Sequence, residues 1–537
     1  MITREHWREW LRVLLLYLPA LVFQIAHYSA EQGNADAIGT GFVQYDQAYY
    51  MANARQYVDG ATDGIRYASP FSVEVEPPAI YFQPQVFVLG QLWRITGADP
   101  GILFSIFGIV FGLLCVRACL RVLDHVLPPG AQGRNLIQLL FVWGGGLLFL
   151  FGMAFGVLHG EGMGTALDNA FRFDPAGGWW FLNLGRNLIY PFEAYYHFLF
   201  FSIVLAILKK RHYTVVVIGA LLAISHPFTG VATLLMLSAW SICEQWILRT
   251  RQLPRWFVPI IVGTLLLSLA YYGVVLPRDP EHAALMAQWK IAWTEDRITT
   301  LAAYAVVAFI ALTQLRSIDR VRTFLRNPFH RLLVIWGTTW FALEQHDLFI
   351  TPVQPLHFTR GYTWCALFLM GAPIHARTIQ WSRDRSGKVI SSLVVAALVV
   401  FLLVDNGAWM TVHTRDNMNG AGENITLTRD QRELYRRLAS ELPSNTLLVC
   451  NDPMTAYLAL VYTPHRSYCS HHSNTPHFAE RHHALIDYFN GRITDPLLEQ
   501  ELVIVNDERV RPFVFAALSE RLFSAGSLVV YRMPAQP

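Results

Sequence analysis

The stretch from Tyr45 to Arg55 combines a carboxylate with aromatic and amide side chains at helical spacing. If this stretch is helical, the 3.6-residue period places on one side Asp46, Tyr49, Tyr50, Asn53 and Tyr57. Aromatic faces beside hydrogen-bonding groups suit a sugar ring, which has apolar C–H faces and polar edges. A carboxylate in such a site can serve as general base on a hydroxyl group. In a soluble protein, a surface helix with one solvated Asp would be the simpler interpretation.

The composition is that of a membrane protein. Of the 537 residues, 53% are hydrophobic and only 15% are charged, well below the quarter that is usual for a globular domain. Lys and Arg gather in alternate connections between apolar segments, so the net charge of +3 reflects their distribution across a membrane. We therefore expect a polytopic α-helical membrane protein, and no nucleic-acid partner.

The apolar segments that must position this stretch give a topology. Segments of spanning length, with a shorter one at 213–226, run roughly over 10–30, 100–122, 135–158, 188–208, 228–248, 255–276, 299–315, 329–347, 361–377 and 388–405. Arg-rich flanks place the N-terminus in the cytoplasm and 31–78 outside. Residues 79–97 are short for a span and are expected at the outer leaflet. The result is about eleven spans, with twelve or thirteen as the alternative, and an external C-terminus.

We expect two domains. Residues 1–411 form a transmembrane catalytic domain, with a first outside loop at 31–78 that carries juxtamembrane helices and a second at 159–187. Residues 412–537 have the composition of a soluble domain outside the membrane, in which strand-like and helical runs alternate, as in a small α/β unit. We expect strands near 446–450, 502–505 and 527–531, and helices over 428–442 and 477–488. No Gly-rich phosphate loop is present, so a lid, docking or stabilising role is favoured over a nucleotide site.

Several other groups have simpler interpretations. Cys450 and Cys469 could form a disulfide if their domain faces an oxidising compartment. The histidines of the C-terminal part do not fit a common metal site, and we interpret them as neutral imidazoles in a surface loop: His465, His471, His472, His477, His482 and His483. The turn from Ser225 to Gly230 joins two short apolar runs, and we expect it to stop below the outer surface, buried in protein or lining a wet cavity.

The order of residues in the first loop resembles a known signature. Asp46, Tyr50, Ala54 and Arg55 are similar to the Asp-Glu-x-x-Tyr-x-x-x-Ala-Arg pattern of the GT-C superfamily of membrane glycosyltransferases, above all the lipid A aminoarabinose transferases and protein O-mannosyltransferases. The run Glu76-Pro77-Pro78 is similar to the Glu-Lys-Pro segment that follows in those families. By motif the resemblance covers about the first 125 residues. The remainder matches only in having many spans and an external soluble domain.

This resemblance implies a GT-C fold and an inverting glycosyltransferase. It implies that a sugar passes from a polyprenyl phosphate donor, without a nucleotide sugar, to a glycan, lipid or protein acceptor on the outer face of a bacterial-type inner membrane. Asp46 would be the catalytic base, and Glu76 would orient the acceptor or hold a divalent cation. Two positions depart from the pattern, because Gln47 replaces the second acid and Pro77 replaces the Lys. Another cation must therefore meet the phosphate.

The candidates for phosphate or sugar contact are Tyr50, Asn53, Arg55, Arg186, Glu193, His197 and Arg360. Arg360 resembles a late Arg that contacts lipid phosphate in such enzymes, although snorkelling to headgroups explains it equally well. Glu193 and His197 lie one turn apart in an apolar run, where a charge usually faces a wet cavity. A metal at Glu76, Glu193 or His197 is left open, since Glu193 and His197 lack a third ligand.

Two other functions are weighed against this one, of which only a transporter would also use intramembrane acids and broken helices. A secondary transporter or flippase for a lipid-linked or sugar substrate is the main alternative, but transporters commonly show two matching halves, and this chain shows none. A membrane anchor whose working part is the C-terminal domain would leave the polar outside loops unexplained.

Overall fold

The computed structural model describes residues 4–29, 36–60, 64–128, 130–174, 177–179, 183–250, 252–290, 292–385, 387–418 and 424–535. Parts of both expected outside loops, residues 31–35, 61–63, 175, 176 and 180–182, lie outside these ranges. The chain forms two compact units. The first comprises Met1–Gln24, Phe107–Ala270 and Ile291–Arg415, and the second Ile25–Ile106, Tyr271–Lys290 and Asp416–Pro537. The first loop thus belongs to the same unit as the C-terminal part, whereas the expected division at residue 411 places the two in different domains.

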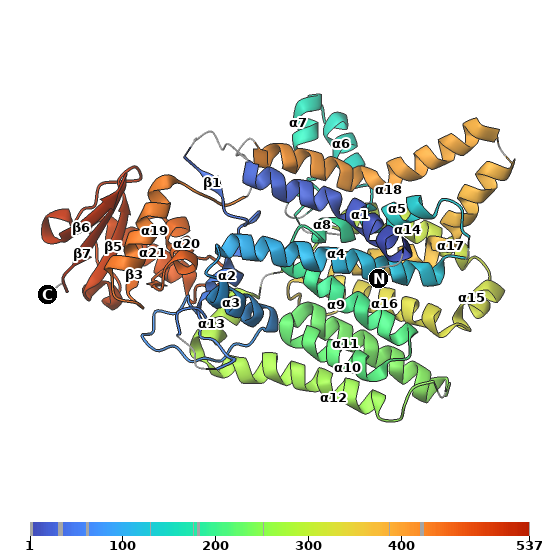
Figure 1. Ribbon diagram of the computed structural model, residues 1–537, viewed down its shortest axis with the longest axis horizontal. Helices are drawn as coiled ribbons and strands as arrows, with labels where there is room; N and C mark the ends of the chain where they lie inside the picture. Colours follow the sequence, from blue (N-terminus) through green and yellow to red (C-terminus); the bar gives the residue numbers. More distant parts are fainter. Residues whose placement is uncertain are drawn as a thin grey trace. The chain divides into compact units, whose positions relative to one another are not determined.

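The first unit is helical (Figure 1). Its helices are α5 (Arg134–Trp143), α6 (Leu148–Leu158), α7 (Met163–Asp168), α8 (Leu184–Asn187), α9 (Pro191–Leu208), α10 (His212–Ser225), α11 (Pro227–Ile242), α12 (Phe257–Ala270), α14 (Arg297–Gln314), α15 (Ile318–Leu325), α16 (Pro328–Glu344) and α17 (Tyr362–Arg385). Three further helices are divided between the units: α1 (Arg4–Ser29), α4 (Pro100–Val126) and α18 (Gly387–Met418).

The apolar segments expected to span are helical in each case. Within the described ranges, six helices are long and apolar enough to cross a membrane, or up to seven if the bent pair α5 and α6 counts as one span. The other expected spans are shorter or carry more charge; α10 has 14 residues and α16 has 17. Apolar helices on this scale make the chain a membrane protein, whereas the count of eleven spans stays a prediction.

Helices α5 and α6 form the two halves of a broken helix, and their axes differ by 63°. The break at Gly144–Leu147 exposes backbone groups that water cannot reach in an apolar surrounding. Asp405 of α18 accepts hydrogen bonds from the backbone N–H groups of Leu148, at 3.1 Å, and Phe149, at 2.8 Å. The neighbouring Asn406 donates to the carbonyl oxygen of Trp143 at 2.8 Å. Asp405 and Asn406, two polar residues inside the apolar helix α18, thus bind the free backbone groups at the end of α5 and the start of α6.

The turn between α10 and α11 is equally tight. His226 has extended backbone angles, and its Nδ1 accepts the backbone N–H of Thr229 at 3.2 Å, which caps the start of α11. Gly230 packs so closely on the backbone of Ala223 that a Cβ atom would overlap it. This turn is expected to be buried in protein or to line a wet cavity, and the buried His226 and Thr229 agree with the first of these.

The second unit combines short helices with strands. Its elements are β1 (Ile38–Gly39), α2 (Gln47–Arg55), α3 (Pro84–Thr96), α13 (Pro280–Gln288), β2 (Thr426–Leu427), α19 (Arg429–Glu441), β3 (Leu447–Cys450), α20 (Pro453–Tyr462), β4 (Arg466–Ser467), α21 (Phe478–Phe489), β5 (Leu502–Asp507), β6 (Glu520–Ala525) and β7 (Leu528–Met533). With 13 residues, α3 is about 20 Å long and shorter than a bilayer core of about 30 Å. Its expected position at the outer leaflet stays a prediction.

Five strands form one mixed sheet in the order β4-β3-β5-β7-β6 (Figure 1). The pairs of β3 with β4 and β5 are parallel, and those of β7 with β5 and β6 are antiparallel. Alternate residues of the central strands, such as Val449, Ile504 and Tyr531, share a buried cluster with Leu485 and Tyr488 of α21. Helices α19 and α20 contact the sheet as well. Every residue of β5 is buried, as expected of a strand covered on both faces.

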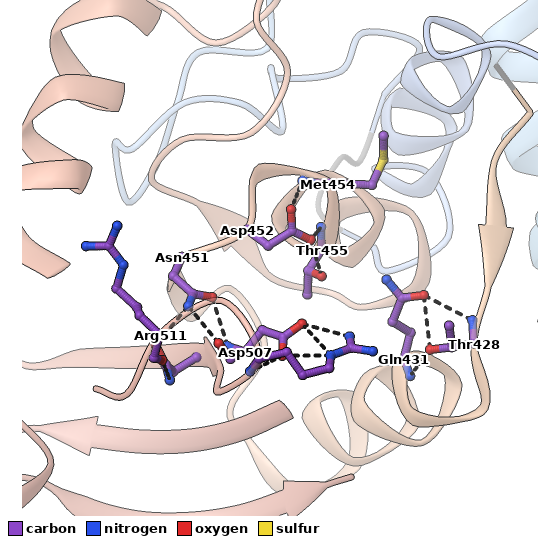
Figure 2. Close-up of polar contacts among 10 residues, drawn as sticks. Thr428, Gln431, Asn451, Asp452, Met454, Thr455, Asp507 and Arg511 are labelled. Atoms are coloured by element: carbon purple, nitrogen blue, oxygen red, sulfur yellow. Dashed lines mark hydrogen bonds and ion pairs between the residues drawn. The ribbon is translucent and has the colours of Figure 1, made fainter. Parts of the chain in front are cut away.

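Polar side chains join the ends of these elements (Figure 2). Thr428 and Gln431 form a capping box at the start of α19, the helix expected over 428–442. Asp452 caps α20 by accepting the backbone N–H of Thr455 at 2.8 Å. Asn451, directly after β3, accepts the backbone N–H of Asp507 at 2.8 Å, which ties the end of β3 to the end of β5.

Candidate functional site

Asp46 is the residue before α2, in the position where an Asp usually caps a helix. Here its side chain makes no capping hydrogen bond, and its backbone is already helical. Gln44 bonds to Asp46 itself, because its Oε1 accepts the Asp46 backbone N–H at 2.8 Å. Omitting a cap usually costs about 0.5–2 kcal/mol, so the Asp46 carboxylate, which is turned away from the helix N-terminus, is expected to have other partners.

The partner of this carboxylate is His471, from the segment between β4 and α21 of the same unit. Its Nε2 lies 3.1 Å from Asp46 Oδ1. The backbone N–H of Ser473 donates to His471 Nδ1 at 3.1 Å, which makes Nδ1 an acceptor and leaves the proton on Nε2, facing the carboxylate. The His471 side chain is 0% exposed, whereas 59% of the Asp46 side chain is exposed. One carboxylate oxygen is therefore held by protein while the group as a whole stays open to an incoming molecule.

The charge of Asp46 follows from these contacts. Loss of water around the carboxyl raises its pKa, but the hydrogen bond and charge of His471, the 3.4 Å bond from Gln44 and the charge of His472 together hold the pKa below its ordinary value. Burial lowers the pKa of His471, against the opposing effect of Asp46. At neutral pH the pair is thus an ionised carboxylate beside a neutral imidazole, and the carboxylate is ready to accept a proton.

Aromatic rings enclose His471. Its ring centroid lies 4.6 Å from that of Tyr45 and 4.9 Å from that of Tyr457, with Tyr49 at 6.1 Å and Phe71 at 6.0 Å. A small recess opens beside it, lined by Tyr49, Asn53, Tyr67, Ser69, Phe71, Tyr81, Leu285, Trp289 and Asn474. The recess beside His471 thus has the aromatic and amide composition that the sequence suggested for a sugar site, although Asp46 is not among the residues that line it.

The other predicted residues of the first loop are distributed around α2. Asn53 is buried and lines the recess, while the ring of Tyr50 lies 6.4 Å from that of Phe104. Arg55 is bound by protein, since its Nε lies 2.8 Å from Asp59 and its Nη1 donates to the carbonyl oxygen of Val461 at 3.0 Å. Glu76 is exposed on the loop before α3, and among the described residues no ion pair to its side chain is found.

Within the first unit, the structure brings together three predicted residues. Arg360 forms an ion pair with Glu193, and its Nη2 lies 3.1 Å from His357 Nδ1. The ring of His197 lies between two carbonyl oxygens, with Nδ1 2.8 Å from that of Glu193 and Nε2 2.8 Å from that of Arg360. Glu193 and His197 are buried, and 17% of the Arg360 side chain is exposed. The Glu193 charge is thus balanced by a cation.

Arg186 and the expected metal ligands have other partners. Arg186 is fully buried, pairs with Asp174 at 3.7 Å and donates to the carbonyl oxygen of Gly178 at 2.6 Å, which gives it a structural role of its own. A metal at Glu193 and His197 does not fit this arrangement, because both ring nitrogens face carbonyl oxygens and the carboxylate faces Arg360. Among the described residues, no three His, Cys, Asp or Glu side chains gather as a metal site would require.

One expectation for the C-terminal part is wrong for two of its six histidines. His471 and His465 are buried and hydrogen-bonded, not exposed in a surface loop, because the sequence did not show which histidine has an aromatic surrounding. Cys450 and Cys469 are free, buried thiols. The residue that the sequence missed is therefore His471. The only available signal was its place in Cys-Ser-His-His-Ser-Asn, a polar run between two apolar stretches.

Comparison with known proteins finds likeness in structure only. Two crystal structures of ArnT from Cupriavidus metallidurans, one bound to undecaprenyl phosphate and one in the apo state, match at 12% identity over 97% of each chain, with TM-scores of 0.47 and 0.48. The Archaeoglobus fulgidus oligosaccharyltransferase, crystallised with a tethered acceptor peptide, matches at 10% identity over 93% of this chain and 69% of its own, with a TM-score of 0.42. No family model and no curated protein sequence matches the chain.

Proposed function

We propose that the protein is an inverting GT-C glycosyltransferase that takes a sugar from a polyprenyl-phosphate donor and transfers it to a hydroxyl of a glycan, lipid or protein on the outer face of a bacterial-type inner membrane. The observation that carries this proposal is the Asp46 carboxylate, which is ionised, exposed and held through one oxygen by His471. Its position in the signature of the first loop supports the same role. The C-terminal domain would then lie outside the membrane, in the same compartment as the first loop.

The proposed reaction is a single displacement at the anomeric carbon. Asp46 takes the proton of the acceptor hydroxyl as its oxygen forms a bond to C1 of the sugar. The bond between C1 and the phosphate oxygen breaks on the opposite side, and its electron pair leaves with polyprenyl phosphate. The configuration at C1 is inverted because one attack takes place from the face away from the leaving group.

The growing negative charge on the phosphate calls for a cation in the transition state. Within the second unit we propose Arg55 for this role, with Glu76 as a contact to the acceptor. Arg55 is already paired with Asp59, but a guanidinium has five N–H groups, and the bonds of Arg55 to Asp59 and Val461 do not use all of them. Tyr50 and Asn53 of the same unit would line the site. No step in this scheme requires a metal.

The same set of lipid-linked sugar donors can distinguish sugar transfer from lipid transport. ArnT was crystallised with undecaprenyl phosphate, so a panel of undecaprenyl-phosphate-linked hexoses and pentoses is a suitable set of probes. Purified protein with a glycan, lipid or peptide hydroxyl acceptor should release undecaprenyl phosphate, detected by mass spectrometry, from at least one donor. A flippase would move the intact lipid between vesicle leaflets without splitting it. Leaflet exchange without release, for every donor in the panel, would contradict the proposal.

A further inference from the structure

The contacts of His471 go beyond those of a packed aromatic residue. Its side chain is 0% exposed, and both ring nitrogens are engaged on opposite sides, Nδ1 by the protein backbone and Nε2 by Asp46. The Asn474 amide nitrogen lies 3.2 Å from Nδ1 and 3.3 Å from Nε2, so it does not select a tautomer. With the backbone N–H of Ser473 donating to Nδ1, the ring has one orientation and one tautomer in which it can reach the carboxylate.

The turn that carries His471 is itself fixed. The His471 carbonyl oxygen accepts the backbone N–H groups of Asn474, at 3.2 Å, and Thr475, at 2.9 Å. Trp289, directly after α13, donates from its indole nitrogen to the carbonyl oxygen of Ser473 at 2.6 Å. Side chain and backbone of one residue thus organise the turn, and a second segment of the unit holds that turn in place.

The loop that carries Asp46 is also held by the C-terminal part of the chain. Tyr457 of α20 donates its hydroxyl to the carbonyl oxygen of Tyr45 at 3.0 Å, and the backbone N–H of His472 donates to the Tyr45 hydroxyl at 3.4 Å. The residue next to Asp46 therefore has two bonds to the C-terminal part of the chain. Hydrogen bonds to the backbone segments that carry Asp46 and His471 thus fix both partners of the contact before any substrate binds.

We infer that His471 is a positioning residue: the C-terminal part of the chain supplies the hydrogen bond that orients the Asp46 carboxylate and keeps it ionised for proton transfer. This inference depends on the proposed function, because it assumes that Asp46 is the base. It assigns the C-terminal part a role in the reaction, where the sequence suggested only a lid, docking surface or stabiliser. A misplaced base costs rate even when it is still present, by up to about 10²-fold.

Other titratable groups face the same carboxylate and have to be considered in any pH experiment. They are His471, His472, Tyr45 and Tyr457. Burial raises the pKa of Tyr45 to about 12 and that of Tyr457 well above its ordinary value, so neither tyrosine ionises near neutral pH. His471, whose pKa is lowered by burial, therefore has to be considered together with Asp46 in the acid limb of a pH profile.

Two substitutions separate the two hydrogen bonds of His471. The amide of Asn superimposes on the Nδ1 side of the ring, so His471→Asn keeps an acceptor for Ser473 and loses the bond to Asp46. The longer Gln side chain places its amide nitrogen near the position of Nε2, so His471→Gln keeps the bond to Asp46 and loses the other. The two variants are matched in polarity and differ in which partner they retain.

The main measurement is the pH dependence of kcat/KM for undecaprenyl phosphate release. In His471→Asn the Asp46 pKa rises, so the acid limb of the profile should move to higher pH and the rate should fall by up to about 10²-fold. In His471→Gln the acid limb should stay near that of the wild type. An unchanged acid limb in His471→Asn, or the same shift in both variants, would overturn the inference.

A second measurement needs no substrate. The apparent Tm is compared for wild type, Asp46→Asn, His471→Asn and the double variant in a double-mutant cycle. Loss of ring packing affects both backgrounds equally, so only the Asp46–His471 contact produces non-additivity, which we expect; additive losses would overturn the inference. If Asp46→Asn retains its activity while the cycle is non-additive, the assigned base is wrong and the contact stands. If Asp46→Asn is inactive and the cycle is additive, the inference alone fails.

Discussion

Replacing Asp405 with alanine should destabilise the protein strongly, because this carboxylate is 0% exposed and accepts two backbone N–H groups at the start of α6. Hydrogen bonds to a charged group contribute about 1.5–3 kcal/mol each, so the loss of both predicts about 3–6 kcal/mol. The substitution leaves both donors in an apolar surrounding that cannot hydrate them. The first turn of α6 and the Gly-rich break before it should be the first part to open.

The assay is the apparent Tm in detergent, followed by tryptophan fluorescence. Asp405→Asn keeps one acceptor oxygen but turns an NH2 group toward a second donor, so it should fall between wild type and Asp405→Ala. Thr411→Ala is the control, since Thr411 is exposed on the same helix and its hydroxyl bonds only to the carbonyl oxygen of Gly407 one turn earlier. An Asp405→Ala protein as stable as Thr411→Ala would refute the account of how the broken helix is satisfied.

Two further predictions concern packing and pH. Gly230→Ala should lower the free energy of unfolding by about 1–3 kcal/mol, because the new Cβ would overlap the backbone of Ala223. Gly219→Ala is the control: the nearest atom to its Cβ would lie at 3.5 Å, so it should be neutral or slightly stabilising. Equal Tm values for the two variants would count against the tight turn. Arg509 holds the pKa of Asp507 below its ordinary value through a hydrogen bond, so this stabilisation is present at neutral pH and disappears as pH falls through the folded-state pKa. The Tm difference between wild type and Asp507→Asn should therefore shrink from pH 6 toward pH 3, and a constant difference would contradict it.

The membrane helices and the strands of the C-terminal part could be predicted because their apolar patterns are long or regular. The strands expected at 446–450, 502–505 and 527–531 are present as β3, β5 and β7. The short strands β4 and β6 were missed: β4 has two residues, and most of β6 is exposed or half-buried, so neither has an apolar pattern. The break at Gly144–Leu147 was read as part of one apolar segment, because its polar partners lie about 260 residues later, at Asp405 and Asn406.

The sequence singles out the acids of the proposed site but does not show their contacts. Asp46 could be identified from its place in a short motif, and Glu193, His197 and Arg360 were each selected separately as charged or polar residues near apolar runs. That Glu193 and Arg360 form a pair does not follow from the sequence, since 167 positions separate them. His471 escaped notice for the same reason: a buried histidine and an exposed one look alike until the fold determines what surrounds them.

The proposed role of Asp46 can be tested by the rate of undecaprenyl phosphate release from the active donor, compared between wild type, Asp46→Asn and Glu74→Gln. Glu74 is an exposed carboxylate of the same loop and serves as the matched control. We expect Asp46→Asn to lose between about 10²-fold and 10⁴-fold in rate while the protein stays folded, with no more than the Tm loss that the missing His471 contact brings, and Glu74→Gln to retain the wild-type rate. An Asp46→Asn protein that releases undecaprenyl phosphate as fast as Glu74→Gln would contradict the assignment of Asp46 as the base.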